Sequence, residues 1–435
     1  MRFRASDAAA ATGGRLLGPD VELDGASFDS RTLRPGQLFV PIVGERDGHD
    51  FIAAAVAAGA PAYLTAVGAA AGLEQATAIE VDDTGAALLR LAAWARDRLT
   101  AARVVGITGS VGKTSVKDFV AAIAARGWRT AAAERSYNNE QGLPITILAA
   151  PDDTQALVLE LGMRGFGEIA RLAEISRPDV GVVTVVAEAH TERVGGIEGV
   201  ARAKAELVEA LPPEGVAVLN ADQPHVVAMA ELTVASVLTF GTTAGDVRAV
   251  DVTLDAEARA RFTLVTPAGE VDVRLGMPGR HMVTNATAAA AAALALDVAP
   301  HDIAAGLGAA QLSPWRMALQ RAPSGAWVLN DAYNANPTSM AAALEALAAL
   351  PAQRRIAVLG VMAELDDAPA AHRRIAAVAA ELEITLVAVG TDLYGIEPVD
   401  DPLQVLASLA GDDAVLVKGS RVAGLEHVAT RLLAG

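Results

Sequence analysis

The chain has 435 residues, no cysteine and a formal net charge of −17 at pH 7. Because one core usually serves about 100–200 residues, we expect two to four domains. The charge argues against a nucleic-acid partner, since phosphate backbones bind clustered Lys and Arg. Lack of cysteine excludes disulfides and thiolate catalysis and suits a reducing cytoplasm. Neither a signal-peptide pattern nor an apolar run of about 20 residues occurs, which predicts a soluble, unprocessed cytoplasmic protein without a membrane partner.

Residues 1–100 are predicted to form a small α/β domain. Short apolar runs, such as 38–43 and 78–81, alternate with turn residues, as is typical of short strands. Helical patterns cover residues 51–58 and 85–99. We therefore expect this N-terminal region to have its own sheet.

Residues 101–312 show the alternation of strand and helix that is typical of a mainly parallel sheet. Strand-like runs lie at 103–108, 157–161, 180–186 and 216–219. Helical patterns lie between them, at 114–125, 168–175 and 198–211. Alternating segments at 247–265 and 270–275 then indicate an antiparallel addition, followed by a helix at 281–296.

Residues 313–435 repeat this alternation and are predicted to form a doubly wound, Rossmann-like domain. Its expected strands lie at 327–330, 355–359, 386–390 and 414–417. One of its helices begins at Asn336-Pro337, where a helix-capping residue precedes a proline at the first helical position. The predicted fold is therefore α/β with three domains, of which the central one has a mainly parallel sheet with an antiparallel addition.

A glycine-rich segment follows the strand at 103–108 and opens the next helix. It consists of Thr108, Gly109, Ser110, Val111, Gly112, Lys113, Thr114 and Ser115. Glycines let backbone N–H groups converge on phosphate oxygens, while Lys113 can reach the terminal phosphates and Thr114 can ligate magnesium. The structural alternative is a simple turn with an exposed lysine.

This segment is a variant of the common phosphate-binding loop. Ile107, and not a glycine, stands five residues before Gly112, and the first glycine is Gly109. The sequence also lacks an Asn-Lys-x-Asp motif that would support guanine recognition. Specificity for guanine is therefore unsupported.

The sequence from this loop onward resembles the Mur ligase family. The resemblance rests on Thr108 to Ser115 and then, in chain order, on Ser136-Tyr137-Asn138-Asn139 with Gly142 and Pro144, Glu160-Leu161-Gly162-Met163, Ala189-His190, Ala203-Lys204-Ala205-Glu206, Gly279-Arg280-His281 with Asn285, and Arg316. The run Asp331-Ala332-Tyr333-Asn334-Ala335-Asn336-Pro337 is characteristic of the members that add D-alanyl-D-alanine. The resemblance covers nearly the whole chain.

The resemblance implies a set of catalytic and metal-binding residues. The catalytic set is Lys113, Glu160, His190, Lys204 and Arg316, and the magnesium set is Thr114, Glu160, His190 and Lys204. Lys204 would be carbamylated, which requires a deprotonated amine. On pattern alone Lys204, between acidic residues of a helix, would be an ordinary surface lysine, and Glu160 and His190 would be solvated polar residues.

The family also implies contacts to ATP and to the other substrates. His281, Asn285, Arg316 and Asp331 would join the residues of the loop in binding ATP. Substrate contacts would come from Ser30, Arg31, Asn138, Asn139, Tyr333, Asn334, Asn336 and Ser339. A solvated turn is an equal alternative for Ser30 and Arg31, and a polar helix start is a near-equal one for His281 and Asn285.

The reaction implied by the resemblance is ATP-dependent amide-bond formation with Mg²⁺. A carboxylate of UDP-N-acetylmuramoyl-tripeptide would attack ATP to give an acyl phosphate, which the amine of D-alanyl-D-alanine would then resolve, in a protein that acts as a monomer. Alternatives are a related ligase with a different acceptor, a non-catalytic ATP-binding homologue, and a motor or switch that hydrolyses ATP. Departures from the family pattern at residues 185–187 and 361–366 leave the fine geometry open.

Overall fold

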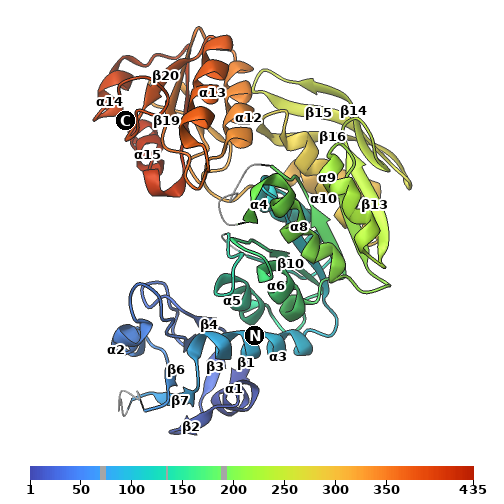
Figure 1. The fold of residues 1–435 in the computed structure, drawn as a ribbon, viewed down its shortest axis with the longest axis vertical. Coiled ribbons are helices and arrows are strands. Elements are labelled where there is room, and N and C mark those ends of the chain that lie inside the picture. The colour runs from blue at the N-terminus through green and yellow to red at the C-terminus, as the bar shows by residue number, and fades with distance from the viewer. Residues whose placement is uncertain (69–74, 134–135, 188–193) are drawn as a thin grey trace. The chain divides into compact units, whose positions relative to one another are not determined.

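The computed structural model of the protein describes residues 1–68, 75–133, 136–187 and 194–435 (Figure 1). These residues form two compact units, each described below by itself. Unit 1 comprises Met1–Ile107, Gly127–Met163 and Gly167–Val180, and unit 2 comprises Thr108–Arg126, Arg164–Phe166 and Gly181–Gly435. Within the described ranges, no helix combines the length and the apolar character that crossing a membrane would need.

Unit 1 begins with a small α/β layer. Its elements are β1 (Arg2–Arg4), α1 (Ala5–Thr12), β2 (Arg15–Leu17), β3 (Glu22–Asp24), β4 (Ala26–Ser27), β5 (Leu38–Phe39), η1 (Gly48–Phe51), α2 (Ile52–Ala57), β6 (Ala62–Ala66), β7 (Thr77–Val81) and α3 (Thr84–Arg98). The sheet has the order β2-β7-β6-β5-β4 and is parallel except for β2. Its apolar core includes the buried rings of Phe39 and Tyr63.

The rest of unit 1 is a second, parallel layer. It contains β8 (Arg103–Thr108, the last residue of which belongs to unit 2), β9 (Thr130–Ala132), α5 (Gly142–Ala149), β10 (Ala156–Glu160) and α6 (Glu168–Ser176). The strands lie in the order β8-β10-β9, and both pairs are parallel. All five residues of β10 are buried, as expected for a strand inside a parallel sheet.

The first part of unit 2 contains the loop at 108–112 and a sheet that changes from parallel to antiparallel. Its elements are α4 (Lys113–Ala124), β11 (Val180–Val183, the first residue of which belongs to unit 1), α8 (Gly196–Glu209), β12 (Val216–Asn220), α9 (Pro224–Val227), η2 (Ala228–Leu232), β13 (Ser236–Gly241), β14 (Val247–Leu254), β15 (Arg259–Thr266), β16 (Gly269–Pro278), α10 (Met282–Ala295) and α11 (Pro300–Ala309). Strands β12, β13 and β14 pair in parallel, whereas β14, β15 and β16 pair antiparallel.

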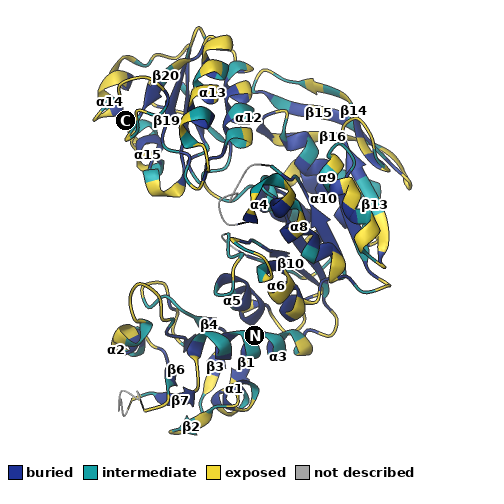
Figure 2. Cartoon of the chain, viewed as in Figure 1, coloured by how far each residue is buried: buried dark blue, intermediate teal, exposed yellow. Residues whose placement is uncertain are grey.

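Helix α10 forms the centre of this part of unit 2. Its alanine run, Ala288–Ala293, is buried throughout, and Figure 2 shows the helix in the buried colour. Helix α10 packs on α4, β12 and β13. Small side chains let these backbones approach closely, so the run serves packing as well as helix propensity.

The last part of unit 2 is a second sheet with its own core. Its elements are β17 (Ala318–Arg321), β18 (Trp327–Asn330), α12 (Pro337–Ala348), β19 (Arg354–Leu359), α13 (Ala368–Glu381), β20 (Thr385–Ala388), α14 (Pro402–Val405), η3 (Leu406–Ser408), β21 (Asp413–Lys418), η4 (Arg421–Ala423) and α15 (Glu426–Ala434). The order is β17-β18-β21-β19-β20, and only β17 is antiparallel. Helix α12 packs on β21 and α13, whereas α15 packs on β18.

The structure confirms the predicted fold class: α/β, with a mainly parallel central sheet, an antiparallel addition and a doubly wound C-terminal part. The domain boundaries proposed from the sequence, at residues 100 and 312, stay a prediction.

Candidate active site

The glycine-rich loop has a backbone conformation, and close contacts, that residues with a side chain could not adopt at two positions. Gly109 and Gly112 have φ values of +145° and +86°, in the region that favours glycine. A Cβ on Gly109 would lie 1.9 Å from Thr184 Oγ1, and one on Gly112 would lie 2.3 Å from Asn285 Oδ1. The loop ends at the N-terminus of the twelve-residue helix α4. Unblocked N–H groups at a helix start form an anion site, as the sequence predicts.

A short segment after β11 fixes the shape of this loop. The Ser110 N–H donates to Val185 O at 2.7 Å, and the Ser110 hydroxyl donates to Ala187 O at 3.0 Å. The Thr184 hydroxyl donates to Val111 O at 2.6 Å. Thr184 was not among the site residues predicted from the sequence. A polar residue in the otherwise apolar run 180–186 was the available signal.

Lys113, Thr114 and Ser115 begin helix α4 beside the loop. The Lys113 ammonium donates to Gly109 O at 2.6 Å, so it lies over the loop. The side chains of Thr114 and Ser115 are buried, as is that of Thr108 at the end of β8. The cation and the helix dipole thus both face the place where phosphate oxygens would bind.

Lys204 is buried in helix α8, with an exposed fraction of 3%. The pattern of charges around it in the sequence favours a surface lysine, and the structure corrects that expectation. Burial, and next the positive charge of Lys113, hold the pKa of Lys204 well below its ordinary value. Because burial disfavours the ammonium form, the amine can be neutral and nucleophilic.

Glu160, in unit 1, ends strand β10 and is also buried. The Asn138 side-chain amide donates to Glu160 Oε1 at 3.0 Å, and the Gly162 N–H donates to Asn138 O at 2.7 Å. A Cβ on Gly162 would lie 2.9 Å from Asn138 Cγ. Asn138, predicted as a substrate contact, thus orients the carboxylate of Glu160.

His190, the remaining predicted metal ligand, lies outside the described residues. Within residues 1–68, 75–133, 136–187 and 194–435, no three His, Asp or Glu side chains gather in a way that could hold a metal ion. The roles of Thr114, Glu160, His190 and Lys204 in metal binding therefore stay predictions.

His281 and Asn285 lie at the start of helix α10. Burial lowers the pKa of His281 to about 4, an effect that Asp331 opposes and Lys418 reinforces. Its Nδ1 atom is buried and has no hydrogen-bond partner among the residues that the structure describes. Asn285 is buried against Gly112. A neutral imidazole with an unsatisfied ring nitrogen, at the start of the helix whose Asn285 packs on the loop, suits a ligand with hydrogen-bonding groups, such as a nucleotide.

Arg316 lies in a tightly bent segment at the start of the C-terminal part. Both of its neighbours, Trp315 and Met317, have left-handed backbones, with φ values of +61° and +48°. Its guanidinium lies 4.2 Å from the centre of the Tyr333 ring, and the Tyr333 N–H donates to Trp315 O at 3.3 Å. Two non-glycine residues in this region store strain, which is common at functional sites.

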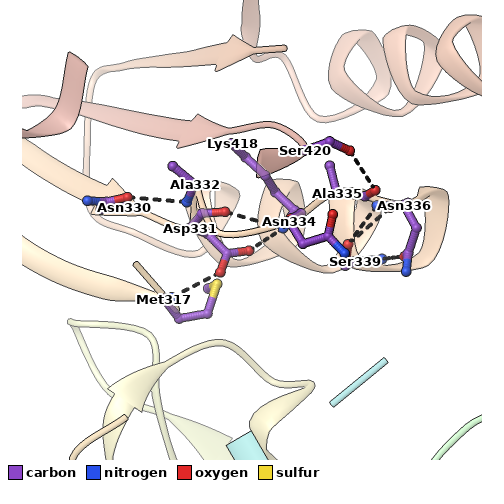
Figure 3. Close-up of polar contacts among 10 residues, drawn as sticks. All are labelled: Met317, Asn330, Asp331, Ala332, Asn334, Ala335, Asn336, Ser339, Lys418 and Ser420. Atoms are coloured by element: carbon purple, nitrogen blue, oxygen red, sulfur yellow. Dashed lines mark hydrogen bonds and ion pairs between the residues drawn. The ribbon is translucent and has the colours of Figure 1, made fainter. Parts of the chain in front are cut away.

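The buried Lys418 forms an ion pair with the partly buried Asp331, which also contacts Met317, the residue after Arg316 (Figure 3). The Lys418 ammonium lies 2.5 Å from Asp331 Oδ2, and Asp331 Oδ1 accepts from the Met317 N–H at 3.1 Å. Asp331 was predicted as an ATP contact, whereas Lys418 was not among the predicted site residues. Both oxygens of Asp331 therefore already have partners within the protein, and each retains room for a second donor.

Three other predicted substrate contacts lie at the start of helix α12. The Asn336 side chain accepts from the Ser339 N–H at 2.9 Å, and the Ser339 hydroxyl accepts from the Asn336 N–H at 3.1 Å. This reciprocal capping box accounts for both residues structurally. Asn334 is exposed, so its amide is the best placed of the three to meet a ligand.

The predicted contacts in unit 1 have local partners. The Arg31 guanidinium donates to both oxygens of Asp29, at 2.9 and 2.8 Å, and its side chain is 85% exposed. Ser30 lies in the same turn. Asn139 Oδ1 accepts from the Gly142 N–H at 2.9 Å and so caps helix α5. These geometries fit either stable turns or preformed binding groups.

A further link, absent from the sequence analysis, joins helix α4 to the start of the C-terminal part. Asp118 accepts from the N–H of Ser313 at 2.7 Å and from its hydroxyl at 3.0 Å. Lys117, buried beside it, lies 2.9 Å from Asp118 Oδ1. Helix α4, which carries Lys113, is therefore also hydrogen-bonded to Ser313, three positions before Arg316.

Comparison with known proteins bears on this arrangement. The profile of the Mur ligase middle domain matches residues 107–293, and that of the Mur ligase glutamate ligase domain matches residues 315–421. A UDP-N-acetylmuramoyl-tripeptide--D-alanyl-D-alanine ligase of Mycobacterium tuberculosis is 43% identical over 94% of this chain and 91% of its own.

Solved structures agree with these matches. The crystal structure of MurF from Acinetobacter baumannii has a TM-score of 0.88 and 31% identity, and the match covers 100% of this chain and 99% of the other. MurF ligase from Thermotoga maritima, in complex with ADP, has a TM-score of 0.80 and 26% identity, with 94% and 97% covered.

Proposed function

This chain belongs to the Mur ligase family, and from that membership we propose that it joins D-alanyl-D-alanine to UDP-N-acetylmuramoyl-tripeptide at the expense of ATP, in the synthesis of peptidoglycan precursors. The names of its full-length relatives support this choice of substrates. The exposed Asn334, beside Tyr333, supports it too, because that loop offers an amide and an aromatic ring to an incoming dipeptide. The protein acts in the cytoplasm, where ATP is available, and as a monomer.

The first step activates the tripeptide. An oxygen of its terminal carboxylate forms a bond to the γ-phosphorus of ATP, the bond from that phosphorus to the bridging oxygen breaks, and ADP leaves. Two anions must approach one another in this step. Lys113, Arg316 and the N–H groups at the start of α4 offset the repulsion by charges and dipoles that are already in place.

The second step forms the amide bond. The amine of D-alanyl-D-alanine attacks the acyl carbon, its nitrogen loses a proton, and inorganic phosphate leaves with the electrons of the broken C–O bond. No covalent bond to the protein forms. The protein therefore acts by positioning three substrates, which makes the geometry of the residues around the loop decisive.

Magnesium fits the oxygen donors on this chain. Thr114 offers a hydroxyl and Glu160 a buried carboxylate, and we assign both, with His190 and a carbamylated Lys204, to metal binding. When bound, Mg²⁺ would neutralise charge on the phosphates. Carbamylation joins the Lys204 nitrogen to the carbon of CO₂ with loss of a proton, which turns the buried amine into an anionic oxygen donor.

The observation that carries this proposal is the burial of Lys204 with a depressed pKa, in the electrostatic field of Lys113. An ammonium in that position would cost free energy without a partner, whereas a neutral amine is ready to react with CO₂. A motor or switch that only hydrolyses ATP gives no reason for such a residue.

The test is ATP-dependent phosphate release with UDP-N-acetylmuramoyl-tripeptide, measured with and without D-alanyl-D-alanine, for the unmodified protein and for Lys204→Ala. We expect release that needs both substrates and is lost in Lys204→Ala. ATP binding should persist in that variant, because the loop at 108–115 is untouched. Phosphate release that does not require both substrates, or that is retained in Lys204→Ala, would refute the proposal.

A further inference from the structure

Lysine is rare in this chain and concentrated near its active site. Only four of the 35 basic residues are lysines: Lys113, Lys117, Lys204 and Lys418. Lys113 and Lys204 serve the phosphate and carbamate sites of the proposed function, and Lys117 lies beside Asp118. Lys418 has no role in the proposed reaction, although it is buried, with an exposed fraction of 2%.

The ammonium of Lys418 has three oxygen acceptors, which equals its number of N–H donors. They are Asp331 Oδ2 at 2.5 Å, Asn334 O at 2.8 Å and Asp331 O at 3.5 Å. Figure 3 shows the side chain extending from β21 to the turn between Asp331 and Asn334. A buried ammonium is tolerated only with such partners, so the turn and the lysine determine each other's position.

The strand order explains why Lys418 reaches this turn. Strand β21 lies between β18 and β19, and the parallel register places Val417 opposite Asn330. The C-terminal ends of these parallel strands therefore lie at the same edge of the sheet, and this is the edge where open α/β sheets bind their ligands. Ser420, two residues after Lys418, makes a second contact with this turn, because its hydroxyl donates to Ala335 O at 3.3 Å.

The same ion pair also reaches the segment of Arg316. Asp331 Oδ1 accepts from the N–H of Met317, the residue that follows Arg316, at 3.1 Å. Asp331 thus lies between the strained segment that presents Arg316 and the turn that presents Asn334. An arginine at position 418 would bring a planar fork of five donors, which does not match one carboxylate oxygen and two backbone carbonyls.

We propose that Lys418 is a positioning residue, which holds the turn at residues 332–336 in the shape that receives the acceptor dipeptide and ties that turn, through Asp331, to the segment of Arg316. This proposal rests on the proposed function for the identity of the acceptor. The positioning itself can be measured without catalysis. All three acceptors of the Lys418 ammonium are oxygens of Asp331 and Asn334, so its effect on the reaction passes through that turn.

The experiment replaces Lys418 with methionine, which keeps the length of the side chain and removes its charge and donors. Hydrogen exchange of the amides at 332–336 should become at least about ten-fold faster than in the unmodified protein. The KM for D-alanyl-D-alanine should rise by at least about ten-fold, which corresponds to the loss of about 1.4 kcal/mol of binding. The KM for UDP-N-acetylmuramoyl-tripeptide should stay within two-fold.

Arg354→Met is the matched control. Arg354, the first residue of β19, pairs with Asp413, the first residue of β21, at the opposite end of β21 from Lys418, with its Nη2 2.7 Å from Asp413 Oδ2. Its replacement also breaks an ion pair of this sheet, so it reports any general loss of stability. We expect normal amide exchange at 332–336 and an unchanged KM for D-alanyl-D-alanine in this variant.

A second variant covers the case in which Lys418→Met leaves the Asp331 carboxylate unpaired and the protein fails to fold. The double variant Asp331→Asn with Lys418→Met removes both charges and should fold, yet still show fast exchange at 332–336 and a raised KM for the dipeptide. Normal exchange and an unchanged KM in a folded variant would overturn the role of Lys418. If the unmodified protein makes no product at all, the proposed function fails, and the exchange data still decide whether Lys418 positions the turn.

Discussion

Gly112 and Asn285 pack so closely that a Cβ on the glycine would lie 2.3 Å from Asn285 Oδ1. Gly112→Ala should therefore weaken ATP binding by at least about ten-fold. The change adds a clash with a buried side chain to the cost of about 1–2 kcal/mol that a left-handed backbone imposes on alanine. Titration calorimetry with ATP measures the effect directly.

Gly127→Ala is the control for this prediction, since no atom lies within 4 Å of the Cβ that the change would add. It should bind ATP as the unmodified protein does. Equal ATP affinity in Gly112→Ala and Gly127→Ala would show that the loop adapts, and that its close packing on helix α10 does not matter for the nucleotide.

His281 should make the stability of the protein depend on pH between about 6.5 and 4. Burial lowers its folded-state pKa to about 4 from 6.5. In this interval the unfolded chain binds a proton that the folded protein does not, so stability falls as the pH falls. The loss stops below about pH 4, where both states are protonated, and amounts to about 3 kcal/mol at 1.36 kcal/mol per pKa unit.

The melting temperature measured at several pH values tests this. His281→Gln should give a shallower fall between pH 6.5 and 4 than the unmodified protein. His301→Gln, at an exposed position, should leave the curve unchanged. A His281→Gln curve parallel to that of the unmodified protein would mean that the imidazole is not buried in the neutral form.

Asn138 should raise the affinity for magnesium by orienting Glu160. Asn138→Leu keeps the approximate size of the side chain and removes the N–H that lies 3.0 Å from Glu160 Oε1. Groups that orient metal ligands are typically worth about 10–100-fold in metal affinity, so half-maximal activity should need correspondingly more Mg²⁺. Asn139→Asp keeps the cap of α5 and should leave the requirement unchanged. The same Mg²⁺ requirement in Asn138→Leu would argue against Glu160 as a ligand.

The local elements were largely predictable, because apolar periodicity decides them. The strand predicted at 327–330 is β18 with the same bounds, and the helix predicted at 168–175 is α6, one residue longer. The loop at 108–115 is a run of consecutive residues, so its motif could be recognised, whereas the contacts from the segment 184–187 that fix its shape could not. Where a site is formed by consecutive residues, the sequence motif was sufficient to identify it.

Relationships between distant residues were not predictable. Lys204 has acidic neighbours, which is the pattern of a solvated helix face, and its burial depends on elements far away in the chain. Lys418 was missed because its partner Asp331 is 87 positions away. Its signal was a lysine directly after the apolar strand predicted at 414–417. Asn336 was expected both as a helix cap and as a substrate contact; it does cap α12, together with Ser339, and the substrate contacts of both residues stay predictions.

The measurement that tests the central claim most directly is the identity of the product. The protein is incubated with ATP, Mg²⁺ and UDP-N-acetylmuramoyl-tripeptide, together with equal amounts of D-alanyl-D-alanine, D-alanine and L-glutamate, and the products are analysed by mass spectrometry. We predict one new nucleotide-linked product, heavier by the dipeptide, with one ADP and one phosphate formed for each molecule. A product carrying a single amino acid, or ADP formed without any new product, would contradict the assignment.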